Sequence, residues 1–149
     1  MFLPLACISV LCALAQSSGH LQAGRPEKVS GKRGAIVQTK IPVSIDEGFH
    51  VNSNKPSEEY LIPLSLTWTS SGALEPGVVM YPKPSTETVA GQKLSVLTGK
   101  FDLVANFKIA ANAQAGPGAA AGKLRYQACN SNTCFPPKTI DVTVPYQVE

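Results

Sequence analysis

The chain has 149 residues, of which 44% are hydrophobic, and its 13 Lys and Arg outnumber its 10 Asp and Glu to give a formal net charge of +3. This composition argues against a disordered chain, and the length suits one domain with a hydrophobic core of its own. The basic residues do not form one dense patch interleaved with aromatic residues, so nucleic acid is a poor candidate partner.

The first fifteen residues differ from the rest of the chain. Residues 2–15 are apolar, too short to span a bilayer comfortably, and end in the small-x-small pattern Ala13-Leu14-Ala15. We therefore predict a secretory signal peptide over residues 1–15, with a periplasmic or secreted product that keeps no integral membrane segment after cleavage. Residues 16–34 are polar and carry Arg and Lys, and we expect a flexible basic leader there.

From residue 35 to residue 149 the sequence predicts one β-rich domain. Apolar and polar residues alternate in several runs, and no run has the period of a helix with caps. The runs with strand character cover residues 35–51, 60–68, 77–81, 94–97, 101–109, 123–128 and 139–148. Residues 111–122 are rich in Ala and Gly around Gly116-Pro117-Gly118, which favours a flexible connection. This pattern predicts an all-β sandwich of immunoglobulin-like type.

The stretch YQACNSNTCFPP contains two cysteines near the end of the domain. Cys7 and Cys12 fall in the signal peptide, which leaves Cys129 and Cys134 as one pair in an oxidising compartment. The turn-forming Asn and Ser residues between this pair, with strand-like runs on both sides, predict a C-terminal β-hairpin joined by a disulfide.

The spacing of this pair leaves three interpretations open. A disulfide that closes a ring of about six residues stabilises by roughly 2 kcal/mol, against about 4 kcal/mol for a ring of some sixty, so its structural contribution is small. An exposed turn also gives an attacking thiolate access, which favours a redox site. A structural clamp in a non-catalytic binding or structural module is the alternative. A metal site has little support, because His20 and His50 lie far upstream in no ligand spacing.

The segment GKLRYQACNSNTCFPPKTIDVTVP resembles the end of the N-terminal periplasmic domain of the thiol:disulfide interchange protein DsbD. The shared pattern is Tyr-x-x-Cys, a short polar loop, Cys, an aromatic residue and Pro-Pro, followed by an alternating strand. Its support residues in this chain are Tyr126, Phe135, Pro136 and Pro137. The similarity extends over residues 35–148, with the specific motif in the last third.

The resemblance implies an immunoglobulin-like domain that passes reducing equivalents through a reversible Cys129–Cys134 disulfide. The implied electron donor is a thioredoxin-like or DsbD/CcdA-type protein, and the implied acceptors are oxidised thiol proteins of the periplasm. By position, Cys134 forms the mixed disulfide and Cys129 resolves it. This implies a thiol:disulfide interchange component that needs no cofactor beyond the cysteine pair. We expect a monomer.

The family shields its cysteines with a cap loop that carries aromatic and acidic residues, and Tyr81 is the predicted cap residue here. No His, Lys or Arg lies within two residues of Cys129, and Lys138 is the nearest cation to Cys134 in sequence. The sequence therefore shows no local means of lowering a thiol pKa. His50 is expected at the surface beside a bend. No hydrolase or kinase motif is present.

Overall fold

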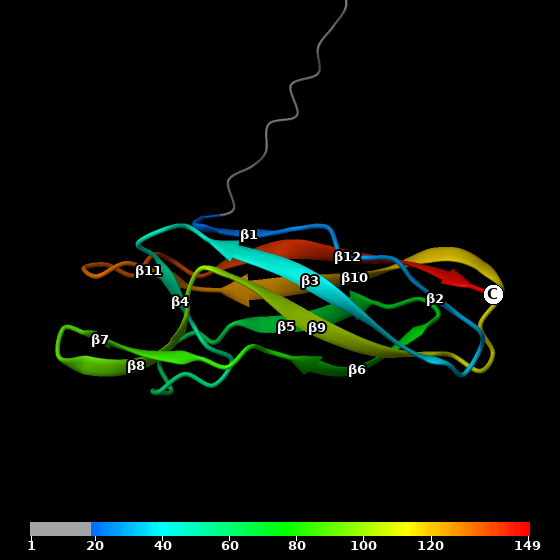
Figure 1. The fold of residues 1–149 in the computed structure, drawn as a ribbon, viewed down its shortest axis with the longest axis horizontal. Helices are drawn as coiled ribbons and strands as arrows, with labels where there is room; N and C mark the ends of the chain where they lie inside the picture. Colours follow the sequence, from blue (N-terminus) through cyan, green and yellow to red (C-terminus); the bar gives the residue numbers. More distant parts are fainter. Residues whose placement is uncertain (1–18) are drawn as a thin grey trace, which may run out of the picture.

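The computed structural model describes residues 19–149, which form twelve β-strands and no helix (Figure 1). The predicted signal peptide, with Cys7 and Cys12, lies outside the described residues. Within residues 19–149 there is no helix of the length and apolar character needed to cross a membrane.

Three four-stranded sheets build the domain. The first contains, in spatial order, β1 (Leu21–Ala23), β3 (Ile36–Ile45), β9 (Lys100–Ile109) and β6 (Leu74–Met80). The second contains β2 (Val29–Gly31), β12 (Lys138–Val148), β10 (Gly116–Tyr126) and β5 (Ser65–Ser70). The third contains β11 (Ala128–Cys129), β4 (His50–Asn52), β8 (Gln92–Leu97) and β7 (Ser85–Val89). All neighbouring strands are antiparallel except β2 and β12, which are parallel.

The first two sheets face each other and enclose the core. Buried and exposed residues alternate along both layers, as the sequence pattern predicts: Leu103, Phe107 and Ile109 of β9 are almost fully buried, and so are Leu124 of β10 and Val144 of β12. The predicted all-β sandwich, with the cysteine pair in its C-terminal region, is confirmed.

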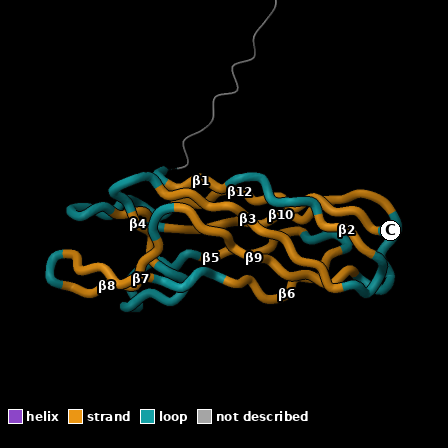
Figure 2. The backbone as a smooth tube through the Cα atoms, in the orientation of Figure 1, coloured by secondary structure: helices purple, strands orange, loops and turns teal. Residues whose placement is uncertain are grey.

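The third sheet lies at one end of the sandwich. Figure 2 shows the strands of the first two sheets running along the long axis, with the β7–β8 hairpin beyond one end and the C-terminus at the other. The β11 segment, where the cysteine loop begins, lies at the same end as β7 and β8 (Figure 1). The third sheet therefore carries the cysteine loop away from the centre of the domain.

Two segments differ from the sequence-based expectations. In the segment predicted as a flexible leader, residues 21–23 and 29–31 form strands, and Leu21 and Val29 are buried against the sandwich. The prediction of a flexible connection over residues 111–122 is wrong from residue 116 onward. Those residues begin β10, which has 11 residues and pairs with β12 over its whole length.

Close packing explains the small residues of β10. A Cβ atom added at Gly118 would lie 2.3 Å from Cζ of Tyr146, and one added at Gly122 would lie 2.9 Å from Cε3 of Trp68. Real Cβ atoms do not approach other atoms so closely, so glycine is required for the aromatic rings to lie against the strand. Trp68 in turn packs edge-on against Phe107, with ring centroids 4.8 Å apart.

Candidate functional site

The two cysteines face each other across a hairpin that begins at β11. Cys129 and Cys134 are antiparallel bridge partners with Cα atoms 4.0 Å apart, and a disulfide joins them. The backbone amide of Phe135 donates to the carbonyl oxygen of Ala128 at 2.9 Å, which closes the hairpin beside the disulfide. The hairpin and disulfide predicted from the turn residues are therefore present.

The side chain of Asn130 organises the turn between the cysteines. Its Oδ1 accepts hydrogen bonds from the backbone amides of Asn132 at 2.9 Å and Thr133 at 2.7 Å. The amide of Asn130 also donates to the carbonyl oxygen of Thr133 at 2.9 Å. This asparagine turn fixes the loop by hydrogen bonds that do not depend on the sulfur–sulfur bond.

The two sulfur-bearing residues differ in exposure. Cys129 is 2% exposed and belongs to the buried interior, whereas Cys134 is an exposed residue. An attacking thiolate must approach one sulfur in line with the disulfide bond. The two residues of the pair therefore differ in how accessible they are to a partner.

Aromatic side chains support the base of the loop. Phe135 has its ring centroid 5.2 Å from that of His20 and 6.0 Å from that of Phe49, and the rings of His20 and Phe49 stack at 3.8 Å. His20 Nδ1 is 3.1 Å from Oδ2 of Asp46, which orients the imidazole. This cluster connects the cysteine loop with the start of β1 and with the turn between β3 and β4.

The other predicted support residues divide between core and surface. Tyr126 is 1% exposed, and its hydroxyl donates to the carbonyl oxygen of Gly19 at 3.2 Å. Pro136 and Pro137 are exposed at the exit of the loop. Gln127 adds a contact that the sequence did not indicate, because its Nε2 donates to the carbonyl oxygen of Phe135 at 3.2 Å.

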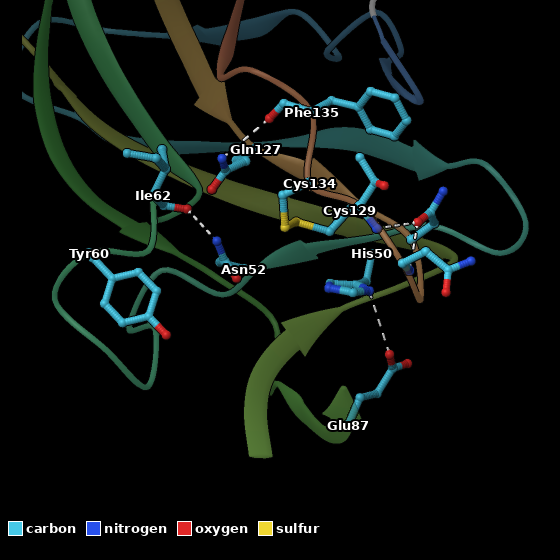
Figure 3. The surroundings of a disulfide bond; sticks show 12 residues. His50, Asn52, Tyr60, Ile62, Glu87, Gln127, Cys129, Cys134 and Phe135 are labelled. Carbon is cyan, nitrogen blue, oxygen red and sulfur yellow. Dashed lines mark hydrogen bonds and ion pairs between the residues drawn. A yellow bond between two sulfur atoms is a disulfide. The ribbon is translucent and has the colours of Figure 1, made fainter. Parts of the chain in front are cut away.

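The structure places His50 in the interior beside the disulfide. The expectation of a surface residue is wrong, since His50 is only 4% exposed. It is the cross-strand partner of Cys129 in the pairing of β11 with β4, and its Nδ1 lies 3.6 Å from Oε2 of Glu87 (Figure 3). Burial lowers the pKa of His50 below the usual value of 6.5, and the carboxylate of Glu87 opposes this shift only in part.

The prediction of a cap residue concerns two tyrosines, Tyr81 and Tyr60. The hydroxyl of Tyr81, the residue named from sequence, accepts a hydrogen bond from the amide of Leu66 at 2.9 Å, and its half-buried ring packs against the core. Tyr60 is 69% exposed, follows two glutamates, and is among the residues that surround the disulfide in Figure 3. Its hydroxyl contacts the side chain of Gln92 on β8 at 3.0 to 3.2 Å. The loop of residues 53–64 therefore contains an aromatic residue beside two acidic residues, which is the composition expected of the cap loop.

No group of three or more His, Cys, Asp or Glu side chains within residues 19–149 is arranged to hold a metal ion. The reactive and titratable groups at this end of the domain include the cysteine pair, the buried imidazole of His50 and the carboxylate of Glu87.

Comparisons with known proteins agree on the type of domain. A family model described as "Thiol:disulfide interchange protein DsbD, N-terminal" matches residues 21–145. The N-terminal periplasmic domain of ScsB from Proteus mirabilis is similar in structure, with a TM-score of 0.57 and 19% identity over 87% of this chain and 47% of that chain. This chain thus spans about half the length of the ScsB domain.

A second solved structure, the reduced N-terminal domain of DsbD from Neisseria meningitidis, gives a TM-score of 0.46 and 18% identity over 80% of this chain and 85% of that chain. Among curated protein sequences, none matches this chain significantly. At 19% identity the ScsB domain bears on the fold alone, whereas the family model covers most of the chain.

Proposed function

The chain belongs to the family of DsbD N-terminal domains, and on that premise we propose that it exchanges disulfides with thioredoxin-fold proteins in the periplasm. Membership of this family supports thiol–disulfide interchange in general. The finer proposal is that Cys134 exchanges with the partner while Cys129 resolves the mixed disulfide. The observation that carries it is the exposure of Cys134 beside a Cys129 that is 2% exposed.

The proposed reduction of the domain has two steps. A thiolate of the donor attacks Sγ of Cys134, the Cys129–Cys134 bond breaks, and Cys129 leaves as a thiolate that takes up a proton. The second thiol of the donor then attacks the donor sulfur of the mixed disulfide. The bond between that sulfur and Cys134 breaks, and Cys134 is released. The donor dithiol is oxidised to a disulfide and the domain gains two thiols. Re-oxidation by an oxidised thiol protein follows the same steps in reverse.

We also propose a cap over the pair. Tyr81 remains the candidate named from sequence, and Tyr60 is a second candidate because it is an exposed aromatic residue at this end of the domain with two acidic neighbours. A ring over the sulfurs would slow attack by small thiols, and a partner would have to displace it before exchange.

Trapping tests the order of attack. The variant Cys129→Ser leaves an accessible Cys134 that cannot be resolved, so it should accumulate a mixed disulfide with an oxidised thioredoxin-fold protein. Cys134→Ser is the matched control, because its remaining thiol is buried. Equal trapping by both variants would refute the order of attack. No trapping by either variant, combined with a reduction potential below about −300 mV for the wild-type pair, would indicate a structural clamp.

A further inference from the structure

The side chains of His50 and Cys129 are neighbours in the third sheet. His50 and Cys129 are directly opposite each other in the antiparallel pair of β4 and β11. Residues in such a position project from the same face of a sheet with Cβ atoms about 5 Å apart. Figure 3 shows the imidazole between the disulfide and the carboxylate of Glu87. The three side chains therefore form a row that runs from the sulfur to the edge of the third sheet.

The two nitrogens of His50 have different surroundings. Nδ1 faces Glu87 at 3.6 Å, so a proton on this nitrogen is stabilised by the carboxylate. Nε2 is buried and makes no hydrogen bond within the described part of the chain. With the proton on Nδ1, Nε2 is a buried acceptor without a donor. A buried polar atom without a partner is costly, and such atoms often mark a functional requirement.

Reduction of the disulfide creates the missing donor. Cys129 becomes a thiol opposite His50, in a position that is 2% exposed and therefore poorly accessible to water. A buried thiol loses its proton with difficulty, because burial disfavours the thiolate. Cys129 can resolve a mixed disulfide only as a thiolate, so the reaction needs a nearby base.

We propose that His50 accepts the proton of the Cys129 thiol during oxidation of the domain and returns it during reduction, with Glu87 holding the imidazolium. This inference rests on the proposed exchange function and assigns it a proton acceptor. The arrangement follows the general pattern of a nucleophile, a base and a group that orients the base.

The step balances as follows. In the mixed disulfide of Cys134 with a partner, Nε2 of His50 removes the proton from Sγ of Cys129. The thiolate attacks Sγ of Cys134, the Cys129–Cys134 bond forms, and the partner sulfur leaves as a thiolate. The imidazolium then gives its proton to solvent or to the leaving thiolate. The two cysteines lose two electrons, and the partner disulfide gains them.

Several charged groups surround His50, and Glu87 is the one whose charge acts on the imidazole. Glu87 approaches from β7, Asp46 and Glu47 come from the turn between β3 and β4, and Lys100 comes from the start of β9. All four line one open groove with His50, which holds three carboxylates and one ammonium group. Because burial keeps the pKa of His50 below 6.5, the imidazole is neutral and able to accept a proton at neutral pH.

The reaction of the reduced domain with Ellman's reagent separates the attack by Cys129 from the earlier attack by Cys134. The exposed Cys134 attacks the reagent, forms a mixed disulfide and releases one thionitrobenzoate in a phase that depends on reagent concentration. Cys129 then releases the second thionitrobenzoate in a phase that does not. The absorbance of the product reports both phases, and no protein partner is needed.

We expect His50→Gln to slow the second phase about tenfold or more at neutral pH and to leave the first phase unchanged, since general-base catalysis contributes at least this much. The wild-type rate of this phase should fall on acidification through an inflection that the variant lacks. Glu87→Gln should slow it by a smaller factor. Glu47→Gln, which removes the same charge in the same groove, is the matched control. A second phase with the wild-type rate and pH profile in His50→Gln would overturn the proposal.

A measurement on the wild-type protein avoids any folding defect of the variant. A hydrogen bond from the Cys129 thiol to Nε2 stabilises the neutral imidazole, so the pKa of His50 measured by NMR should fall on reduction. An identical titration in both redox states would contradict the proposal. These tests of His50 do not depend on the trapping experiment. If the second phase depends on His50 but no partner is trapped, only the proposed class of partner is refuted.

Discussion

Reduction of the disulfide should cost little stability. The bond joins positions five residues apart, and the chain-entropy relation for a ring of about six residues gives a loss of about 2 kcal/mol in the free energy of unfolding. The hydrogen bonds of Asn130 and the bond from Phe135 to Ala128 hold the hairpin without the sulfurs. Since domains of this kind have about 5 to 15 kcal/mol of stability, the reduced form should remain folded.

The same loss of stability determines how far folding changes the reduction potential of the pair. A thermodynamic cycle equates the stability lost on reduction with the difference in reduction potential between the folded and unfolded chains. For a two-electron couple, about 2 kcal/mol corresponds to roughly 40 mV. The folded domain should therefore hold its disulfide only slightly more tightly than the unfolded chain does, which is compatible with the proposed exchange of electrons.

Urea unfolding of the oxidised and reduced domain, followed by circular dichroism, measures this loss directly. The double variant Cys129→Ala/Cys134→Ser is the control, because its midpoint should not change when reductant is added. A loss above about 5 kcal/mol on reduction, or a reduced form without near-ultraviolet dichroism, would refute the reasoning. The pair would then be a clamp and the hydrogen-bonded turn would be insufficient by itself.

Four further outcomes follow from the contacts described above. Tyr60→Ala should speed reduction by dithiothreitol several-fold if this ring covers the pair; Tyr81→Ala should instead lower stability by about 1 to 3 kcal/mol, because the amide of Leu66 loses its partner. Gly122→Ala should cost about 1 to 3 kcal/mol in urea unfolding, since the added Cβ would lie 2.9 Å from the carbonyl oxygen of Thr67. Acidification below about pH 6.5 should lower stability less in His50→Gln than in the wild type, since unfolded His50 binds its proton at a higher pH than folded His50 does.

Each of these outcomes has a contrary result. Faster reduction in Tyr81→Ala with an unchanged rate in Tyr60→Ala would restore Tyr81 as the cap. An unchanged urea midpoint in Gly122→Ala would mean that β10 is not packed against Trp68 as described. For the pH effect the sign is fixed: the contribution of His50 is fully present above pH 6.5 and is lost as the pH falls through the lowered pKa of the folded state. Equal acid sensitivity in His50→Gln would contradict it.

The sandwich could be predicted where burial on one face produced a period of two, as in β9 and β12. The sandwich could not be predicted where close packing requires a small side chain, because such residues show no alternation of polar and apolar types. In β10 the small residues meet Tyr146 and Trp68 from other strands, so the segment has the composition of a loop and the environment of a central strand. The strands of three residues that hold Leu21 and Val29 are too short for any period.

The candidate site also has a part that could be predicted from the sequence and a part that could not. The cysteine pair, its turn and Phe135 are close in sequence, so residue types and spacing were sufficient to place them together. His50 and Glu87 are 79 and 42 residues before Cys129, and only the register of β4 with β11 and the position of β7 bring them to the disulfide. The sequence signal for His50 was slight, a histidine directly before the apolar Val51 rather than in a polar run.

The proposed order of attack rests on this register rather than on the cysteine spacing. Cys129 is the last residue of β11, is paired with β4 and is only 2% exposed. Cys134 lies beyond the turn and pairs only with Cys129 in the isolated bridge, so its other edge faces solvent. The two cysteines thus differ in exposure, and the buried Cys129 lies opposite a histidine. In the proposed exchange, a partner thiolate therefore reacts at the surface while His50 moves the proton of Cys129 inside the domain.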